Sequence, residues 1–425
     1  MNLDSRQLID FFDRSMAVSF YALIFFLPIS NALVETFTVL ILLFYLTKRS
    51  LIFARRVREE KFPGLRPVVV MFLSCFEPPA NALNHPIMIW MGVCLFSIVI
   101  SERPDLSFHG FLGKVLQNAF LFFNFVEAIR TKERVNYFLL SFIMSAFFIC
   151  LSGINQYVLH MDFIRNHILQ QHRINSTFRA PNDFAAYLVI VIPLLMSFFA
   201  YSEKPKGPAG VSHENRIRLS VILMTLLAVI CLGLTYSRGG WLSLGVALGM
   251  FSIFNWHFFK KVLIGIIGFM GIFMVKMIKE REFMDFHNMF ASFGRMTYWH
   301  EALRMIADKP IFGFGLNTYS IIGRRYKESW GGYPHNCYLQ MTAELGIVGL
   351  CSFLWILINL YRVVFQAIKA AGDPQQRALL IGAATGLGAF LIHSGFDTFF
   401  YSVQLSALMW MMMGLLISLV SIEET

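Results

Sequence analysis

Charged residues are scarce in this chain, and the scarcity decides its class. Only 15% of the 425 residues are charged, whereas 56% are hydrophobic and 16% are aromatic. A soluble globular domain carries roughly 25% charged residues, so this composition excludes one and requires many membrane spans. The sequence predicts an all-α polytopic membrane protein that forms a single integral membrane domain over residues 1–425.

The chain also lacks the short C-x-x-C spacing that zinc and redox sites use. We therefore expect no metal site, no disulfide framework and no cofactor. The first apolar run has no small-residue cleavage site after it, so we expect the first span to be retained. The six cysteines fall mostly inside apolar runs, at Cys75, Cys94, Cys150, Cys231, Cys337 and Cys351.

Apolar stretches long enough to cross a bilayer recur along the chain, and we count about twelve. Basic residues concentrate in short connections such as "KRSLIFARRVREEKFPGLR" and "RTKER", so the positive-inside rule places these connections and the N-terminus in the cytoplasm. The predicted spans are residues 15–31, 33–47, 86–101, 112–129, 135–157, 183–201, 217–236, 240–256, 260–278, 341–366, 377–396 and 400–420.

This topology places two long loops on the outer side, residues 158–182 and residues 279–340, the second between the ninth and tenth spans. Long loops on a rigid scaffold often carry function. Within the second loop, "GRMTYWHEALRMIADKP" predicts an amphipathic helix that lies against the membrane or the bundle and stops at Pro310. A short helix carrying Arg324, Arg325 and Lys327 is expected after it. The apolar positions of the amphipathic helix are Met296, Trp299, Leu303 and Ile306.

Arginines on the outer side run against the positive-inside rule and need a ligand or a counter-ion. Arg238 in "LTYSRGGWLSL" is such a residue, because it occupies a tight turn between two predicted spans and has no acid nearby in sequence. Guanidinium groups favour planar bidentate acceptors, and phosphate is a good one. The alternative is that Arg238 snorkels and ties the turn to lipid headgroups.

His335 stands just before the predicted span 341–366. A neutral imidazole near a membrane interface can take a proton from a hydroxyl group, so His335 is a candidate general base. The alternative is a histidine that caps the helix start or meets a headgroup. Further along, Gly346 and Gly349 are expected to allow close helix packing.

Three more ionisable residues lie in or beside the late spans. Glu344 is expected to pair with a basic or hydroxyl partner inside the membrane. His393 and Asp397, in "HSGFDTFFYS", are expected either to orient a neighbour or to hydrogen-bond across helices.

Two motifs carry a resemblance to a known family. An R-x-x-x-L pattern reads Arg238-Gly-Gly-Trp-Leu242, and an H-[NSQ]-x9-G-x-x-G pattern begins at His335 and ends at Gly349. Both resemble the O-antigen ligase and polymerase superfamily, the WaaL and Wzy_C type of membrane glycosyltransferase. Also similar are "STFRAPNDFAAYLVIVIPLL" and "WHEALRMIADKPIFGFGLNTY". One departure is Leu350, because ligases commonly carry Asp, Thr or Asn at that position, and this weakens the case for ligase over polymerase.

The resemblance implies a GT-C-like fold and transfer of a glycan from undecaprenyl pyrophosphate to an acceptor hydroxyl. The reaction would occur at the periplasmic face of the bacterial inner membrane, would invert the anomeric centre and would need no metal. Arg238 and His335 are then expected to be catalytic, as diphosphate ligand and base. The implied partners are the lipid-linked glycan donor, a lipid A-core acceptor and membrane lipid, with no nucleic acid. Further substrate-binding candidates are Arg179, Arg304, Arg325 and Asn336.

Several functions share this donor chemistry. The first choice is an O-antigen ligase, and the alternatives are an O-antigen polymerase and a protein O-oligosaccharyltransferase. A transporter of lipid-linked sugars is the rival from another class. Transport would favour ionisable residues at the bilayer midplane and paired, Gly- or Pro-broken helices, whereas the sequence gathers its ionisable residues at the outer interface. The sequence therefore favours chemistry at that surface.

Overall fold

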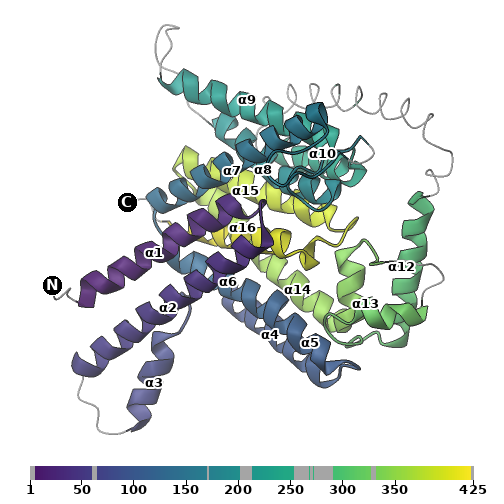
Figure 1. Ribbon diagram of the computed structural model, residues 1–425. Helices are drawn as coiled ribbons and strands as arrows, with labels where there is room; N and C mark the ends of the chain where they lie inside the picture. Colours follow the sequence, from purple (N-terminus) through teal and green to yellow (C-terminus); the bar gives the residue numbers. More distant parts are fainter. Residues whose placement is uncertain are drawn as a thin grey trace.

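The computed structural model describes residues 5–59, 65–169, 172–201, 213–252, 291–326 and 332–422, together with Gly268 and Gly271. Over these residues the chain is a helical bundle (Figure 1), so the predicted all-α architecture is confirmed for them. The helices are α1 (Ser5–Phe26), α2 (Asn31–Glu59), α3 (Leu65–Cys75), α4 (Asn84–Val99), α5 (Pro104–Gly110), the π-helix η1 (Phe111–Leu116), α6 (Gln117–Ala128), α7 (Lys132–Leu159), α8 (Pro181–Tyr201), α9 (His213–Leu234), α10 (Arg238–Ser252), α12 (Ala291–Asp308), α13 (Tyr319–Ile322), the 3-10 helix η3 (Gly323–Tyr326), α14 (Cys337–Ala370), α15 (Pro374–His393), the 3-10 helix η4 (Phe399–Tyr401) and α16 (Val403–Ser421).

Five of the described helices are long and apolar enough to cross a membrane: α2, α7, α8, α14 and α16. Two shorter apolar helices are α4 and the Arg218–Leu234 part of α9. The predicted total of about twelve spans stays a prediction, because span 260–278 and the end of span 240–256 lie largely outside the described residues.

The centre of the bundle is formed by α8, α15 and α16, which are buried along most of their length. The sequence of α15 explains this position. Its middle reads "IGAATGLGAF", and small residues at a helix interface let two backbones approach closely in a membrane. α15 packs most extensively against α8.

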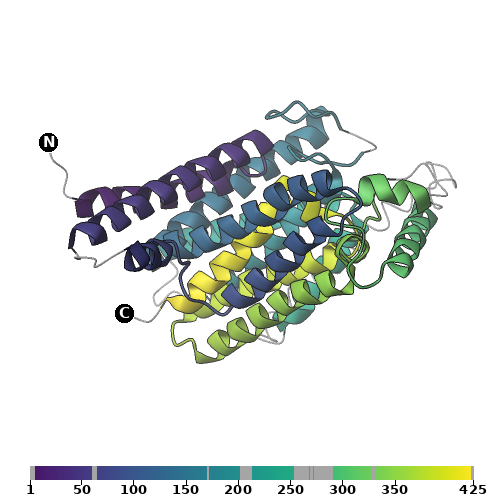
Figure 2. The same ribbon diagram turned by 90° about the horizontal axis from the view of Figure 1, so that it is seen from below.

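The bundle has two distinct ends (Figure 2). The start of α1 and the end of α16 lie at one end, the terminal end, and α12 and α13 lie at the other, the loop end. Charged side chains pair toward the terminal end, where Lys48 Nζ donates to Glu127 Oε1 at 2.8 Å and Arg134 Nη1 lies 2.7 Å from Asp13 Oδ2.

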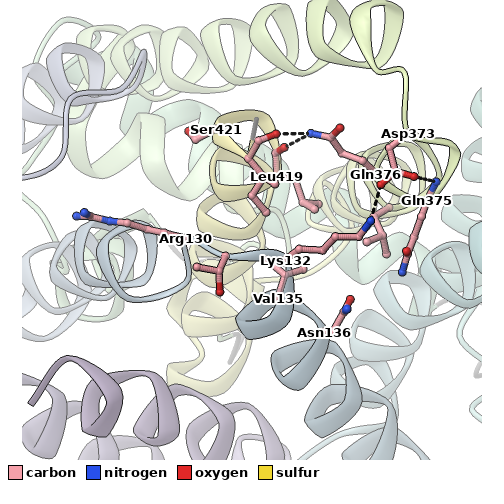
Figure 3. Close-up of a pocket in the computed structure, with 12 residues that line it drawn as sticks. Arg130, Lys132, Val135, Asn136, Asp373, Gln375, Gln376, Leu419 and Ser421 are labelled. Carbon is pink, nitrogen blue, oxygen red and sulfur yellow. Dashed lines mark hydrogen bonds and ion pairs between the residues drawn. The ribbon is translucent and has the colours of Figure 1, made fainter. Parts of the chain in front are cut away.

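A cavity of about 520 Å³ opens between the starts of α7 and α15 and the end of α16 (Figure 3). Lys132 and Asp373 form an ion pair of 2.7 Å across its lining, and Gln376 donates to the carbonyls of Leu419 and Ile422. Neither predicted catalytic residue lines this cavity. The candidate site therefore lies elsewhere in the bundle.

The predicted amphipathic helix exists as α12, which ends at Asp308 before Pro310, and one side of it packs against the loop before α14 and against α14 itself. Met296 and Leu303 are exposed, whereas Ala302 and Met305 pack in a small core with Phe314, Tyr319, Ile322 and Ala343. The predicted short helix is confirmed by α13 and η3, which carries Arg324 and Arg325. Lys327 lies outside the described residues.

α14 is interrupted at Gly346, where the sequence predicts close packing in a continuous span. The backbone there has φ 66° and ψ −173°, which is not helical. The segment before Leu316 docks into the break, since the Gly315 N–H donates to Glu344 O at 2.8 Å and the Ile347 N–H donates to Pro310 O at 2.9 Å. The nine residues 337–345 therefore form a separate short helix that carries His335 at its start.

Candidate functional site

The first turn of α14 fixes the position of His335. His335 itself has φ 48°, a left-handed conformation that is uncommon for a residue with a side chain. The Asn336 side-chain oxygen accepts the backbone N–H groups of Tyr338 and Leu339, both at 3.0 Å, and so caps the helix. The Cys337 N–H donates to Ser394 O at 2.9 Å, which anchors the turn on the segment after α15.

His335 is paired with Asp397. Its Nδ1 lies 2.9 Å from Asp397 Oδ1, while the Tyr298 ring lies 5.9 Å from the imidazole, centre to centre. A carboxylate can only accept, so Nδ1 carries the hydrogen and the Nε2 of a neutral ring is left to accept a proton. The side chain of His335 is 39% exposed and that of Asp397 is 14% exposed, so the carboxylate lies beneath a reachable imidazole.

The surroundings of Asp397 favour its charged form. Burial alone would raise the pKa of this carboxyl, but the hydrogen bond and the charge of His335, the Asn182 amide and the Thr398 N–H together lower it below its ordinary value. Asn182 Nδ2 donates to Oδ2 at 2.8 Å and the Thr398 N–H donates to Oδ1 at 2.9 Å. Asp397 therefore remains a carboxylate that can orient His335 and stabilise an imidazolium.

Arg238 begins α10 at the same place. Its neighbour Gly239 has no room for a side chain, because an added Cβ would lie 2.8 Å from His393 Cδ2 and 3.3 Å from Phe396 Cβ. The start of α10 thus rests directly on the turn after α15, and the next residue of that turn, Asp397, holds His335. Arg238 is exposed there. The turn after α15 thus contacts both the Arg238 motif and the His335 motif, which lie about a hundred residues apart in sequence.

His393 is part of this support. It is 1% exposed, packs edge-on against Phe399 with centroids 4.6 Å apart, and places Nε2 3.4 Å from Ser237 Oγ. Of the two roles predicted for His393, the contact across helices is the one observed. For Asp397 the other predicted role is observed, because its carboxylate orients the neighbouring His335.

Known proteins are similar to this chain over the segment that contains Arg238 and His335. Residues 223–354 match the family model described as O-antigen ligase, and this range contains both Arg238 and His335. The O-antigen ligase of Salmonella typhimurium is 23% identical over 345 residues, which is 75% of this chain and 79% of that protein. The predicted resemblance to the O-antigen ligase family is confirmed.

Two further relatives match a shorter stretch. A putative polysaccharide ligase of Rickettsia conorii is 28% identical over 183 residues, and an uncharacterised protein of Haemophilus influenzae is 26% identical over 185 residues. Each match covers 37% of this chain. The chain spans 44% of the Rickettsia protein and 46% of the Haemophilus protein, less than half of either.

The other arginines predicted by the resemblance to O-antigen ligases lie in different settings. Arg179 is exposed just before α8. Arg304 is exposed on α12. Arg325 is held by Glu102, with Nη1 2.5 Å from Oε2, and Lys309 binds the other oxygen of Glu102 at 2.9 Å. Arg325 therefore clamps η3 to the turn between α4 and α5.

Glu344 fastens the loop before α13 to the histidine motif that begins at His335. It is 1% exposed, and its carboxylate accepts the backbone N–H groups of Asn317 at 2.8 Å and Tyr319 at 3.2 Å. The Tyr401 hydroxyl donates to it at 3.2 Å, so the predicted hydroxyl partner is confirmed. Glu344 thus holds the short helix 337–345 and the loop before α13 in one arrangement.

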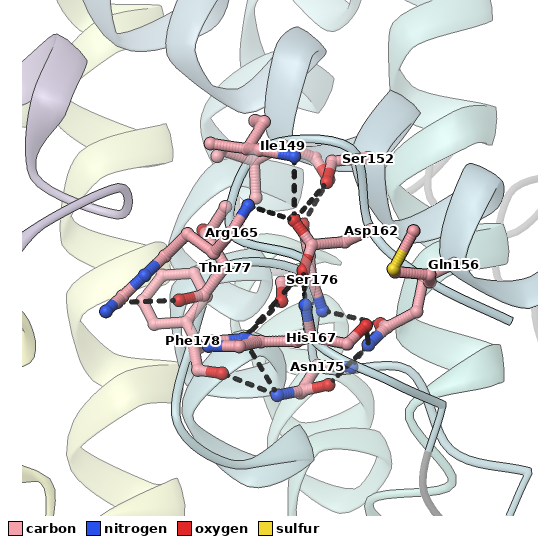
Figure 4. Close-up of polar contacts among 12 residues, drawn as sticks. Ile149, Ser152, Gln156, Asp162, Arg165, His167, Asn175, Ser176, Thr177 and Phe178 are labelled. Atoms are coloured by element: carbon pink, nitrogen blue, oxygen red, sulfur yellow. Dashed lines mark hydrogen bonds and ion pairs between the residues drawn. The ribbon is translucent and has the colours of Figure 1, made fainter.

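The connection between α7 and α8, described over residues 160–169 and 172–180, is built around buried polar residues (Figure 4). Asp162 Oδ1 accepts the N–H groups of Ile164 and Arg165 at 2.9 and 2.7 Å. Gln156 Oε1 accepts the N–H groups of Asn175 and Ser176 at 3.0 and 2.9 Å. This network fixes the conformation of the described residues that lead into α8.

Sequence reasoning assigned no role to Asn182, which touches Asp397 directly. The residue lies inside the family-like stretch "STFRAPNDFAAYL", so its position in a motif was the available signal. Its partner is 215 residues away in sequence, and no local pattern could pair the two.

Proposed function

We propose that this chain is an O-antigen ligase that transfers a polysaccharide from undecaprenyl pyrophosphate to a hydroxyl of lipid A-core. The supporting observation is the His335–Asp397 pair, held next to the start of α10 where Arg238 lies. Arg238 and His335 both lie inside residues 223–354, the segment that matches the O-antigen ligase model. The proposal includes a GT-C-like arrangement in the bacterial inner membrane, with the loop end facing the periplasm.

The proposed chemistry is a single displacement. The Nε2 of His335 accepts the proton of the acceptor hydroxyl as its oxygen attacks the anomeric carbon. The bond from that carbon to the diphosphate breaks, and the diphosphate leaves with the electron pair. Arg238, with Arg179 as a second candidate, stabilises the charge on the leaving group, and Asp397 stabilises the imidazolium. The proton then passes to the released diphosphate or to water, and the configuration is inverted.

A deletion strain complemented with the native gene or with His335→Ala tests this proposal. Lipopolysaccharide is separated on a gel, and lipid-linked glycans are extracted in parallel. Bare core together with long polymer stranded on its lipid carrier is the expected result for His335→Ala. His109→Ala, which removes an exposed histidine of α5, is the matched control and should restore the full ladder. An unchanged ladder in His335→Ala would refute the proposal.

A second candidate is an O-antigen polymerase, and Leu350 favours it because O-antigen ligases commonly carry a polar residue there. The same experiment separates the two functions. Core that bears a single repeat unit, instead of bare core, identifies a polymerase, since ligation would then still occur.

A further inference from the structure

We propose that Asn182 and Arg173 are positioning residues that hold Asp397, and through it His335, in register with the turn that carries Arg238. The inference deepens the proposed function and rests on it. The two residues form a chain of side-chain hydrogen bonds that runs from the His335–Asp397 pair to the backbone just before α10.

The chain of hydrogen bonds has a fixed direction. Arg173 Nη2 donates to Asn182 Oδ1 at 3.0 Å, and Asn182 Nδ2 donates to Asp397 Oδ2 at 2.8 Å. A guanidinium can only donate and a carboxylate can only accept, so the amide has a single orientation that satisfies both neighbours. Asn182 is therefore a connector whose two ends cannot be exchanged.

Asn182 determines the rotation of the Asp397 carboxylate. The other oxygen, Oδ1, accepts His335 Nδ1 and the Thr398 N–H, both at 2.9 Å, and the Asn182 amide occupies Oδ2. With both oxygens engaged, the carboxylate cannot turn without losing a donor in a largely buried place. Removal of the amide would leave Oδ2 without this donor and would let the pair with His335 loosen.

Arg173 connects this pair to the Arg238 turn. Its Nε donates to Thr235 O at 2.8 Å, and the N–H of the following residue, Ile174, donates to Leu234 O at 3.2 Å. Thr235 stands three residues before Arg238. Arg173 therefore spans from the backbone that leads into α10 to the amide that holds Asp397, which keeps the proposed base and the proposed diphosphate ligand at a constant separation.

The loop that carries Arg173 is itself anchored. Besides the contacts from Gln156 to Asn175 and Ser176, the Thr177 hydroxyl donates to Pro28 O at 2.6 Å. A side chain on such a fixed support can impose its position on its partners. Catalytic geometry is sensitive to this, since a displacement of about 1 Å can cost roughly 100-fold in rate.

The test uses the purified full chain in lipid nanodiscs with an undecaprenyl-pyrophosphate-linked glycan and a lipid A-core acceptor. We expect Asn182→Ala to lower kcat roughly 10- to 100-fold and to change the KM of either substrate less than about threefold, because the amide holds the carboxylate that orients the base and does not bind the substrate. Asn136→Ala, which removes an amide at the terminal end, is the matched control and should keep wild-type kcat.

The dependence of Asn182→Asp activity on pH distinguishes a positioning role from a purely structural one. Only a positioning role makes activity depend on the protonation of the side chain at position 182. The introduced carboxylate faces Asp397, so activity at neutral pH should fall at least as far as in Asn182→Ala. At lower pH the introduced group binds a proton and can again donate to Asp397, so part of the loss should be recovered. The charged and titratable groups around position 182 and Asp397 are Arg173, His335, Asp183 and His393, and they are shared by both variants.

The outcomes separate this inference from the proposed function. Full activity of His335→Ala, or no transfer by the wild type, would overturn the proposed function. If His335→Ala is inactive while folded Asn182→Ala keeps wild-type kcat, the positioning role alone is refuted. Asn182→Ala with unchanged kcat and a raised KM would also refute it, because the amide would then bind substrate.

Discussion

Replacement of Gly346 by alanine should destabilise the packing of the loop before α13 against α14. Gly346 has φ 66° and ψ −173°, a conformation that residues with a side chain rarely adopt. An added Cβ would lie 2.1 Å from Ile311 O and 2.4 Å from Phe312 N. Both are backbone atoms, so no side-chain rotation can relieve the contact.

Gly346→Ala should lower the free energy of unfolding through backbone strain and through overpacking. Backbone strain of this kind costs about 1–3 kcal/mol, and overpacking costs a further 1–3 kcal/mol or so. If the loop moves away, the hydrogen bonds from Gly315 to Glu344 and from Ile347 to Pro310 are lost at about 1 kcal/mol each. A loss on the order of 4 kcal/mol in the free energy of unfolding follows, above the usual range for single substitutions.

The assay is unfolding of the purified protein in mixed micelles, with wild type, Gly346→Ala and Gly92→Ala compared. Gly92 lies in α4 with open space where a Cβ would be added, so its alanine variant should remain within about 1 kcal/mol of wild type. Equal stability of Gly346→Ala and wild type would show that the break in α14 is not required, and the reasoning would be wrong.

Three further predictions concern the loop end. Arg238→Lys should lose most transferase activity in the nanodisc assay, because a point charge replaces a bidentate fork, and a fully active lysine variant would indicate snorkelling instead. Gly239→Ala should displace the His393 ring and lower kcat in the same assay while the protein stays folded, and an unchanged kcat would contradict the packing argument. Glu102→Gln should lower the Tm slightly, since exposed ion pairs contribute about 0–1 kcal/mol. The hydrogen bond from Lys309 and the contact with Arg325 lower the Glu102 pKa below 4.5, so this stabilisation is present above pH 4.5 and lost as pH falls through the lowered value. The Tm difference between wild type and Glu102→Gln should therefore shrink as the pH falls below 4.5, and a constant difference would exclude the clamp.

Several features could be predicted from the sequence because each depends on neighbours along the chain. Composition gave the membrane class, and helical spacing before Pro310 gave α12. Motif spacing singled out Arg238 and His335, and both residues lie inside the segment that matches the family model. The inward face of α12 was harder, because its buried side includes Glu301 and Ala302, and hydrophobicity alone does not select those residues.

The sequence by itself determined that this chain lies in a membrane and which two motifs carry its resemblance, since composition and short spacings are local properties. Only the tertiary structure decided what holds those motifs together. Asp397 meets His335 across 62 residues and Asn182 across 215, and the break at Gly346 exists because a loop docks there. Such contacts are set by how helices pack in three dimensions, and no pattern within one helix records them.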